Sequence, residues 1–454
     1  MLYAALSGFA GILSIYLTPV ALVIASLVLL PYVRPLRVLR PRKLLSALTD
    51  LPDSARSSPL RALSLALAGT LGVGNITGVA SALASGGPGA VFWMWMGALL
   101  VIPVKYAEVS LAVRFRRRNR DGWYGGAMYY IREGLSGKFP ETVCTALGGG
   151  FAVLCALNAL ITGNLVQANA AACVVPPERR MQCGAVLGGM VLFSLLWGVP
   201  RIERITSALI PPLTGGYLLL SLGILAANAA WIPGILREIV SCAFSPRAFL
   251  GAAAGFSVRE ALRFGIMRGI FSNEAGCGTS PTAHASAETK SPHHQACYGA
   301  VEVAFDTLLL CTVTALVLLT ADRRYGLIPW HSECDMAPVT LDAFGSLAGE
   351  AARLLLAVSV ILFAFGTMLA QLYYGTTALG YLTAKKEPRI LYSLLSAVCP
   401  LVGAGISAPV LWLSADLILG IMTVVNCSVL ILLRRLCPSP SPEASSQRPP
   451  GDPD

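Results

Sequence analysis

Long stretches without a charged residue dominate this sequence and limit the folds that the chain can adopt. About 20 consecutive apolar residues cross the hydrocarbon core of a bilayer as one helix. A polytopic, all-α membrane protein is therefore predicted. The long runs that contain no Lys, Arg, Asp or Glu are 1–33, 62–104, 142–177, 181–200, 205–236, 307–321, 354–384, 390–415 and 417–433.

Composition supports this prediction and excludes other classes of protein. Charged residues make up 13 % of the 454 residues, against about 25 % in soluble domains, and the mean hydropathy is +0.67. There is no H-E-x-x-H, G-x-S-x-G or P-loop motif, and Gly72-Val73-Gly74 follows no predicted strand. We expect no enzyme activity, no bound cofactor and no nucleic-acid partner. The net charge of +10 is therefore interpreted as Lys and Arg collected in cytoplasmic loops.

The distribution of Lys and Arg predicts that topology. If the basic linker 34–61 is cytoplasmic, the loops on its side hold 23 Lys and Arg and the opposite loops hold 6. Positive residues collect on the cytoplasmic side, so we expect a multi-pass protein of the plasma (inner) membrane. The N-terminus would lie outside and the C-terminus in the cytoplasm, with eleven spans in the lipid bilayer. The first span is 1–33, which lacks a basic start and reads as a retained helix.

The C-terminal tail and the cysteines complete the expected organisation. The Pro/Ser-rich tail 437–454 is predicted to be disordered and cytoplasmic. Most of the twelve cysteines lie in apolar runs and no C-x-x-C pair is present, so they are interpreted as small hydrophobic residues. Cys242 and Cys334 fall in predicted outer segments, where a disulfide between them stays an open alternative.

Two apolar segments are interrupted in their middles. Glycines and a proline that weaken a helix occur at 68–75 (AGTLGVGN) and at 271–281 (FSNEAGCGTSP). In hydrocarbon, an unwound backbone is tolerated only in buried positions or where it lines a cavity. Interrupted helices in corresponding positions of two halves indicate the midplane binding site of a transporter. The halves would be 62–228 and 259–436, joined by 229–258, although glycines that merely permit close helix packing are the alternative for each break.

Around these breaks the sequence resembles the sodium:alanine (alanine or glycine:cation) symporter family, from about Ser7 to Arg435. The resemblance implies one N-terminal helix followed by a five-plus-five inverted repeat of the neurotransmitter-sodium-symporter type. It also implies symport of a small neutral amino acid with Na⁺, and it identifies 259–284, which hydropathy alone rejects, as the sixth core helix. The motifs are GTLGVGNITGVASALASGGPGAVFWMW (69–95), KYAEVSLAVRFR (105–116), YGGAMYYIREGL (124–135), RGIFSNEAGCGTSPTAHASAET (268–289) and FDTLLLCTVTALVLL (305–319).

The resemblance also implies site residues. Phe271 would cover the substrate as an aromatic lid, and Gln167 would contact it, although interhelical hydrogen bonding is the alternative for a polar residue in a span. The expected substrate-binding residues are Gly74, Asn75, Gln167, Phe271, Cys277, Thr367 and Gln371. The expected sodium-binding residues are Ala68, Thr70, Leu71, Asn75, Ser272 and Thr367.

Several residues leave the chemistry open. Glu274 and Asp306 are acids within predicted spans, where a structural and a functional role are equally consistent with the sequence. Arg268 is a candidate partner for Glu274. The family usually has Ser-Thr at Gly366-Thr367, Trp at Gln371, Glu at Thr376 and Met at Cys277.

These departures suggest a roomier and more polar pocket than is usual in the family. Na⁺-coupled uptake of alanine or glycine by alternating access is the favoured function. The alternatives are H⁺ coupling, a broader range of polar amino acids, or a ligand-binding sensor that does not transport.

Overall fold

The computed structural model describes residues 8–33, 59–120, 122–195, 201–244, 257–289, 291–331 and 336–437. Within these residues, seven continuous helical stretches are long and apolar enough to cross a membrane. This confirms the prediction of a polytopic, nearly all-helical membrane protein. The seven stretches are Gly89–Arg114, Glu141–Ala172, Ile202–Ala227, Pro292–Tyr325, Glu350–Leu382, Glu387–Gly405 and Ala408–Leu436.

The helices follow the apolar runs of the sequence, with turns at Gly, Pro and charged residues. They are α2 (Thr18–Val33), α5 (Pro59–Thr70), α6 (Thr77–Gly86), α7 (Gly89–Arg114), α8 (Ala127–Leu135), α9 (Glu141–Leu160), α10 (Val166–Ala172), α11 (Arg180–Leu195), α12 (Ile202–Ala227), α13 (Ile232–Phe244), α14 (Val258–Asn273), α15 (Pro281–His284), α16 (Pro292–Val303), α17 (Thr312–Tyr325), α18 (Met336–Ala348), α19 (Glu350–Leu382), α20 (Glu387–Gly405) and α21 (Ala408–Leu433). The π-helical turns Leu13–Leu17, Ile161–Leu165 and Ala304–Cys311 precede α2, join α9 to α10, and join α16 to α17.

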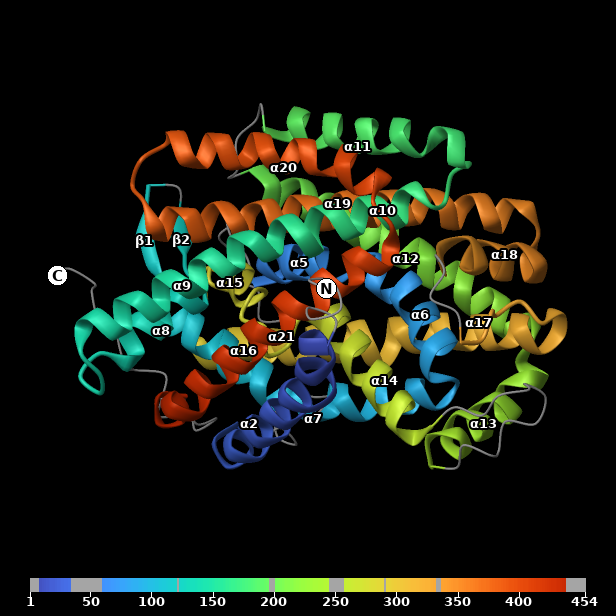
Figure 1. The fold of residues 1–454 in the computed structure, drawn as a ribbon, viewed down its shortest axis with the longest axis horizontal. Coiled ribbons are helices and arrows are strands. Elements are labelled where there is room, and N and C mark those ends of the chain that lie inside the picture. The colour runs from blue at the N-terminus through green and yellow to red at the C-terminus, as the bar shows by residue number, and fades with distance from the viewer. Residues whose placement is uncertain are drawn as a thin grey trace.

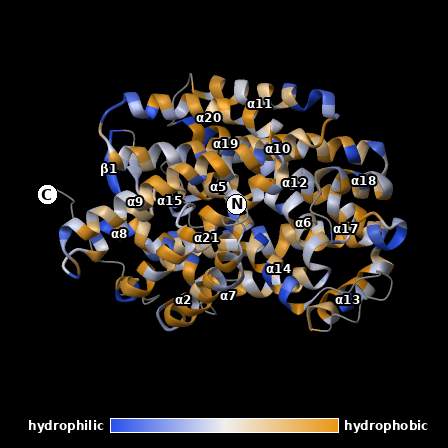
Figure 2. Cartoon of the chain, viewed as in Figure 1, coloured by the Kyte–Doolittle hydropathy of each residue, from blue (hydrophilic) through white to orange (hydrophobic). Residues whose placement is uncertain are grey.

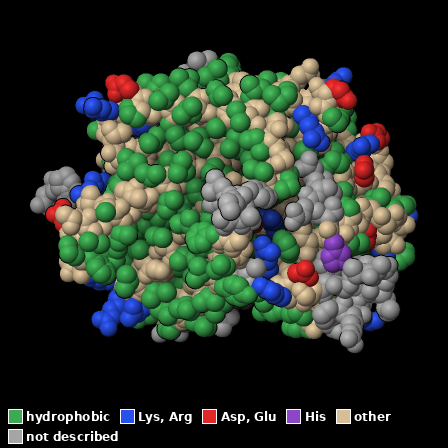
Figure 3. Space-filling view, viewed as in Figure 1, with side chains coloured by type: hydrophobic (Ala, Val, Ile, Leu, Met, Phe, Trp, Pro, Cys, Tyr) green, Lys and Arg blue, Asp and Glu red, His purple; other side chains and the backbone are tan. Residues whose placement is uncertain are grey.

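The long helices run roughly along the long axis of the molecule, with α5, α15 and part of α14 among them in the middle (Figure 1). Hydrophobic residues predominate along the central parts of the helices, and hydrophilic ones are more frequent at the two ends (Figure 2). In the space-filling view, hydrophobic side chains cover the middle of the visible face (Figure 3). Most of the charged side chains on that face lie toward its left and right ends, as expected for a protein surrounded by lipid.

One feature departs from an all-α fold. A short antiparallel hairpin, β1 (Arg117–Asn119) with β2 (Gly122–Tyr124), forms in the basic segment after α7 and pairs Arg117 with Tyr124. At the same end of the molecule, Nη1 of Arg114 donates to the Leu436 carbonyl at 2.9 Å, and Nζ of Lys138 donates to that of Leu432 at 2.7 Å. This end, which we call the hairpin end, therefore also holds the end of α21.

Some predicted boundaries were wrong. The runs 390–415 and 417–433 were separated at Asp416, but the turn lies at 406–407 and Asp416 is inside α21. The sequence boundary was set at the charge of Asp416, but the actual turn contains no charged residue. The turn precedes Ala408-Pro409, and Pro409 lies in the first turn of α21. The connecting segment 229–258 contains α13, and α5 begins at Pro59, inside the predicted linker 34–61.

Other expectations fall on residues outside this description. Residues 34–58, 438–454 and Cys334 are not among the described residues, so the linker, the tail and the disulfide stay predictions. Four of the eleven predicted spans correspond to α2, α11 and the two interrupted helices, which are shorter than the seven long stretches.

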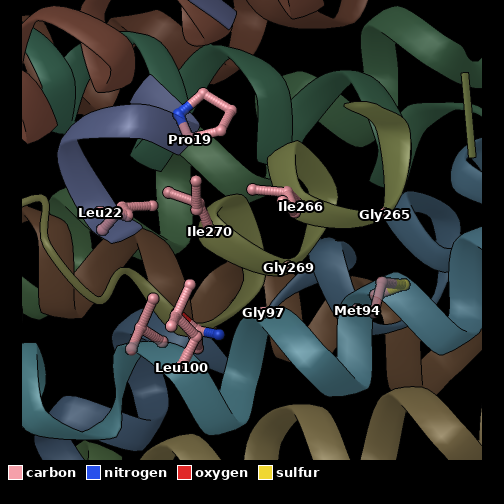
Figure 4. A pocket seen from close by; sticks show the side chains of 11 residues that line it. Pro19, Leu22, Met94, Gly97, Leu100, Gly265, Ile266, Gly269 and Ile270 are labelled. Atoms are coloured by element: carbon pink, nitrogen blue, oxygen red, sulfur yellow. The ribbon is translucent and has the colours of Figure 1, made fainter. Parts of the chain in front are cut away.

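The N-terminal helix α2 packs beside α7 and α21, and it borders a gap that α14 also lines. Figure 4 shows Pro19 and Leu22 of α2 near Ile266 and Ile270 of α14, with Leu100 of α7 on the other side of a small apolar gap. The glycines Gly97, Gly265 and Gly269 line the same gap. Small residues of this kind let helices approach closely in a membrane, so α2 is an integral part of the bundle.

Candidate functional site

The first break lies between α5 and α6. After Thr70 the chain bends at Leu71 and Gly72, forms the 3₁₀ turn Val73–Asn75, and resumes as α6 at Thr77. The Val73 N–H donates to Oε1 of Gln167 at 3.1 Å. A side chain of another helix thus satisfies a backbone donor that the break leaves unpaired, as a buried unwound segment requires.

The second break follows α14 and contains three residues in the left-handed region before α15 begins at Pro281. Glu274, Gly276 and Gly278 have φ values of 51°, 86° and 76°, a conformation that glycine adopts at little cost. The Gly276 and Gly278 N–H groups donate to the Glu108 carboxylate at 3.1 and 2.9 Å. Backbone N–H groups in turns of this kind can converge to form a concave anion-binding site. In this structure the carboxylate of Glu108 occupies that site.

A small cavity separates the two breaks. Within the described residues it leaves room for about one water molecule. Gly72 borders the same region, since an added Cβ there would lie 2.6 Å from Thr367 Oγ1 and 2.7 Å from Gln167 Oε1. The side chains and backbone that line the cavity come from α5, α14, α19 and α21, the breaks and the Ile161–Ala172 segment: Gly69, Thr70, Gly74, Thr162, Gln167, Phe271, Glu274, Thr367, Gln371 and Leu419.

Next to the first break lies a cluster of polar side chains, Asn75, Ser272 and Asp306, which we call the Asn75 cluster. Nδ2 of Asn75 donates to Ser272 Oγ at 2.9 Å and to Asp306 Oδ1 at 2.7 Å, and Ser272 Oγ donates to Asp306 Oδ2 at 2.7 Å. All three residues are buried, and Oδ1 of Asn75 has no hydrogen-bond partner in the described chain. Asp306 also accepts from Thr307 at 2.9 Å, so its described partners are uncharged donors.

The structure brings five of the seven expected substrate-binding residues together. These are Gly74, Gln167, Phe271, Thr367 and Gln371, which line the cavity together with Thr70 from the expected sodium set. Two expected residues do not line it: Asn75 and Cys277, whose Sγ instead lies 3.3 Å from Thr423 Oγ1.

Four further positions bear on the expected sodium site. Ala68 and Leu71 are buried at the end of α5, and Ser272 belongs to the Asn75 cluster. Gly366 faces α12, since an added Cβ would lie 2.8 Å from Ile210 Cδ1.

The suggestion that Arg268 pairs with Glu274 is wrong. Nη1 of Arg268 donates to Asp416 Oδ1 at 3.1 Å, and its guanidinium lies 4.1 Å from the centre of the Trp412 ring. Arg268 is on α14 and faces α21, whereas Glu274 lies past the end of α14 in the left-handed break. Glu274 instead accepts from Gln371 Nε2 and from Thr279 Oγ1, each at 2.6 Å.

The same residues separate the cavity from a larger pocket. The Phe271 and Trp412 rings pack edge to face with centroids 4.7 Å apart. A more open, partly polar pocket on the other side is lined by Trp412, Arg268 and Asp416, together with Ser81 and Ser85 of α6. Two aromatic rings and a partly buried ion pair therefore lie on this side of the cavity.

Sequence reasoning missed a buried charge network next to the second break. Nζ of Lys105 donates to the Asn273 carbonyl at 2.9 Å and lies 3.1 Å from Glu302 Oε1, while His284 Nε2 lies 2.9 Å from Glu302 Oε2. The charge-free run 62–104 stops just before Lys105, but α7 continues through Lys105 and Glu108 to Arg114. The sequence contained one signal for this network, because Lys105 and Glu108 are ionisable residues at the end of an apolar run. An ionisable residue within a span is a candidate functional residue.

Comparisons with known proteins show the family to which this chain is similar. The model of the sodium:alanine symporter family matches residues 1–440. The chain is 36% identical over 380 residues to "Sodium/alanine symporter AgcS" of Methanococcus maripaludis, covering 83% of this chain and 82% of that protein. It is 33% identical over 382 residues to "Probable sodium/glutamine symporter GlnT" of Bacillus subtilis, covering 84% of this chain and 77% of that one.

A solved structure shares the fold. The crystal structure of MhsT in complex with L-phenylalanine superimposes with a TM-score of 0.56 at 18% sequence identity. The match covers 84% of this chain and 90% of that chain.

Proposed function

Since the chain belongs to the sodium:alanine symporter family, we propose that it couples Na⁺ entry to uptake of a small neutral amino acid, alanine or glycine. Transport would proceed by alternating access through eleven spans. One N-terminal helix would be followed by inverted five-helix halves at 62–228 and 259–436, each containing one of the two interrupted helices. The observation that carries the proposal is the small cavity between those breaks.

The substrate would occupy this cavity. Its carboxylate would meet the first break, because the N-terminus of α6 faces the break and a helix N-terminus favours an anion. Gln167 and Thr367 would supply further polar contacts, since both side chains border Gly72. Phe271 would cover the substrate, because its ring lies between the cavity and the outer pocket.

One Na⁺ would bind in the Asn75 cluster. Ser272, Asp306 and the Thr70 carbonyl would provide oxygen ligands together with Asn75, whose unpaired Oδ1 is available. A buried carboxylate within a span is costly unless a positive charge accompanies it, and the described partners of Asp306 are neutral. A cation here would neutralise Asp306 and join the first break to α14.

A second Na⁺ would bind between the end of α5 and α19. The Ala68 and Leu71 carbonyls would face it with the hydroxyl of Thr367. Hard cations stripped of water need an oxygen at each coordination position, and Gly366 offers no hydroxyl beside Thr367. We therefore expect weaker Na⁺ binding than is usual in the family.

The orientation follows from the positive residues. The hairpin end, with the basic segment 114–138 and the end of α21, would lie in the cytoplasm. The pocket lined by Trp412, Arg268 and Asp416 would then open to the outside of the plasma membrane. Opening toward the outside would require Phe271 to separate from Trp412 and the Arg268–Asp416 pair to break.

Reconstitution tests this function against its alternatives. Purified protein in proteoliposomes is given labelled alanine under an inward Na⁺ gradient, a choline control, or a pH gradient without Na⁺. We expect accumulation only with Na⁺; one Na⁺ moving down 100 mV and a tenfold gradient provides about 3.7 kcal/mol, enough for several-hundred-fold accumulation. Accumulation driven by the pH gradient would establish H⁺ coupling instead, and binding without counterflow would identify a sensor.

A further inference from the structure

We propose that Glu274 and Gln371 form a side-chain subsite that selects a substrate with a neutral hydrogen-bond donor, most closely the hydroxyl of serine. The inference rests on the proposed function, because it assigns the substrate class of the same cavity. It differs from the expectation of alanine or glycine, neither of which has a polar side chain. The argument uses the position, pairing and free acceptor of these two residues.

The position of the pair places it at one end of the cavity. Thr367 and Gln371 are four residues apart on α19 and therefore share one face of the helix. Thr367 borders Gly72 at the first break, whereas Gln371 contacts Glu274 at the second. If the substrate backbone is held at the first break, its side chain points toward Gln371 and Glu274, about one helical turn away.

The pairing fixes which atom of Gln371 is free. Nε2 donates to Glu274 Oε1, and the other carboxylate oxygen of Glu274 accepts from Thr279. The reverse amide orientation would place two acceptor oxygens against each other while Glu274 is ionised, because a carboxylate can only accept. The carboxylate therefore orients the amide and leaves Oε1 as the unpaired group.

This Oε1 is a buried acceptor without a partner. Gln371 is 1 % exposed, and Oε1 has no hydrogen-bond partner among the described residues. The side chain lies against Gly163 of the π-helical turn, where an added Cβ would collide with the Gln371 Cβ and Cγ. Because the absence of a side chain at Gly163 makes room for it, Gln371 is held at the cavity wall.

An unpaired buried acceptor selects for a donor. A ligand hydroxyl can pair with Oε1, whereas the methyl group of alanine would leave the oxygen unpaired. A site built to hydrogen-bond a polar substrate group discriminates strongly against an analogue that lacks it. One neutral hydrogen bond corresponds to a preference of roughly tenfold.

Size and charge narrow the choice of donor. The cavity as it stands has room for about one water molecule, so any substrate must widen it, and a hydroxymethyl group requires less widening than the longer carboxamide of glutamine. Both oxygens of Glu274 already accept hydrogen bonds from Thr279 and Gln371. The carboxylate therefore does not require a substrate with a cationic side chain as a partner.

Competition for uptake tests the subsite. Initial Na⁺-driven uptake of labelled alanine is measured with unlabelled serine, alanine, glutamine or lysine in the parent and in Gln371→Leu. We expect serine to compete roughly tenfold better than alanine in the parent, and the two to compete equally in Gln371→Leu. The control Thr377→Val changes a hydroxyl on the same helix that donates to the Tyr373 carbonyl, and it should keep the serine preference.

A second variant separates recognition from helix packing. Glu274→Gln removes the charge that orients the Gln371 amide, so we expect the ratio of serine competition to alanine competition to fall at least threefold, whatever the absolute uptake rate. A merely structural link between α14 and α19 would lower the amount of folded protein without changing the serine-to-alanine ratio. The ratio in Gln371→Leu decides the question if Glu274→Gln does not fold.

Each remaining outcome has a distinct meaning. Equal competition by serine and alanine in the parent, with Na⁺-driven alanine uptake intact, overturns the subsite and leaves the proposed function standing. Stronger competition by glutamine or lysine than by serine overturns the choice of side chain. Absence of Na⁺-driven uptake for every amino acid contradicts the proposed function itself.

Discussion

The two interrupted helices differ in what pairs with their unwound backbone. At the second break, two glycine N–H groups bind the fixed carboxylate of Glu108, which Asn426 also contacts at 2.6 Å. At the first break, the Val73 N–H binds the neutral amide of Gln167, a residue that lines the cavity.

This difference assigns different tasks to the breaks. A carboxylate held by several buried donors is expensive to move, because each hydrogen bond to a charged group contributes about 1.5–3 kcal/mol. A single neutral side-chain contact can be exchanged for a ligand at small cost. We infer that the backbone of the second break at Gly276 and Gly278 is held as a structural element, whereas the backbone of the first break is the adaptable part that meets the substrate.

The largest effect on transport is expected at the first break. Asn75→Ala removes the carboxamide that joins Ser272 and Asp306, so Na⁺-driven alanine uptake should fall at least about a hundredfold, or about 2.7 kcal/mol. The thermal midpoint should stay near that of the parent, because glycines rather than Asn75 interrupt the helix. Initial uptake rates in proteoliposomes provide the measurement, and a rate within twofold of the parent contradicts the assignment.

The largest effect on stability is expected at the second break. Glu108→Ala leaves the Gly276 and Gly278 N–H groups and the Asn426 amide without their shared acceptor, so the free energy of unfolding should fall by about 3–5 kcal/mol. Glu108→Gln is the matched control, because it keeps one acceptor oxygen and should lose about half as much. Unfolding in detergent, followed with and without substrate, measures both. Unchanged stability in Glu108→Ala would remove the distinction between the breaks.

A pair of glycine substitutions sharpens the comparison. Gly72→Ala is compatible with its φ of −117°, but the added Cβ would meet Thr367 and Gln167, so uptake should fall about tenfold with little loss of stability. Gly278→Ala must adopt a φ of 76° and would place Cβ 2.7 Å from Phe151 Cζ, so stability should fall by about 1–2 kcal/mol. Uptake per folded molecule should change little in Gly278→Ala. The reverse assignment of defects would contradict the two roles.

The smallest effect is expected from Gly366→Ser. The new hydroxyl beside Thr367 should lower the Na⁺ concentration for half-maximal uptake by about twofold, because it supplies another hard oxygen ligand. The gain is small because the terminal methyl of Ile210 must first move from a position 2.8 Å from the new Cβ. Uptake rate against Na⁺ at fixed membrane potential measures the change. An unmoved Na⁺ dependence would place the second ion elsewhere.

Sequence alone predicted the features that depend on local chemistry. Charge-free runs predicted the membrane helices, because an apolar run of sufficient length is stable in a bilayer wherever it occurs in the chain. Glycine and proline predicted both interruptions, since they weaken a helix through the backbone itself. The resemblance then named Gly74, Gln167, Phe271, Thr367 and Gln371, which the structure gathers at one cavity.

Only the tertiary structure decided which partners these residues have. Glu108 reaches Gly276 and Gly278 across 168 and 170 residues of sequence, and Arg268 reaches Asp416 across 148. No local pattern encodes such pairings, because they depend on how separate helices pack and on which face each presents. For that reason the sequence assigned Arg268 to Glu274, whereas the fold pairs Glu274 with Gln371 and leaves one acceptor oxygen unpaired.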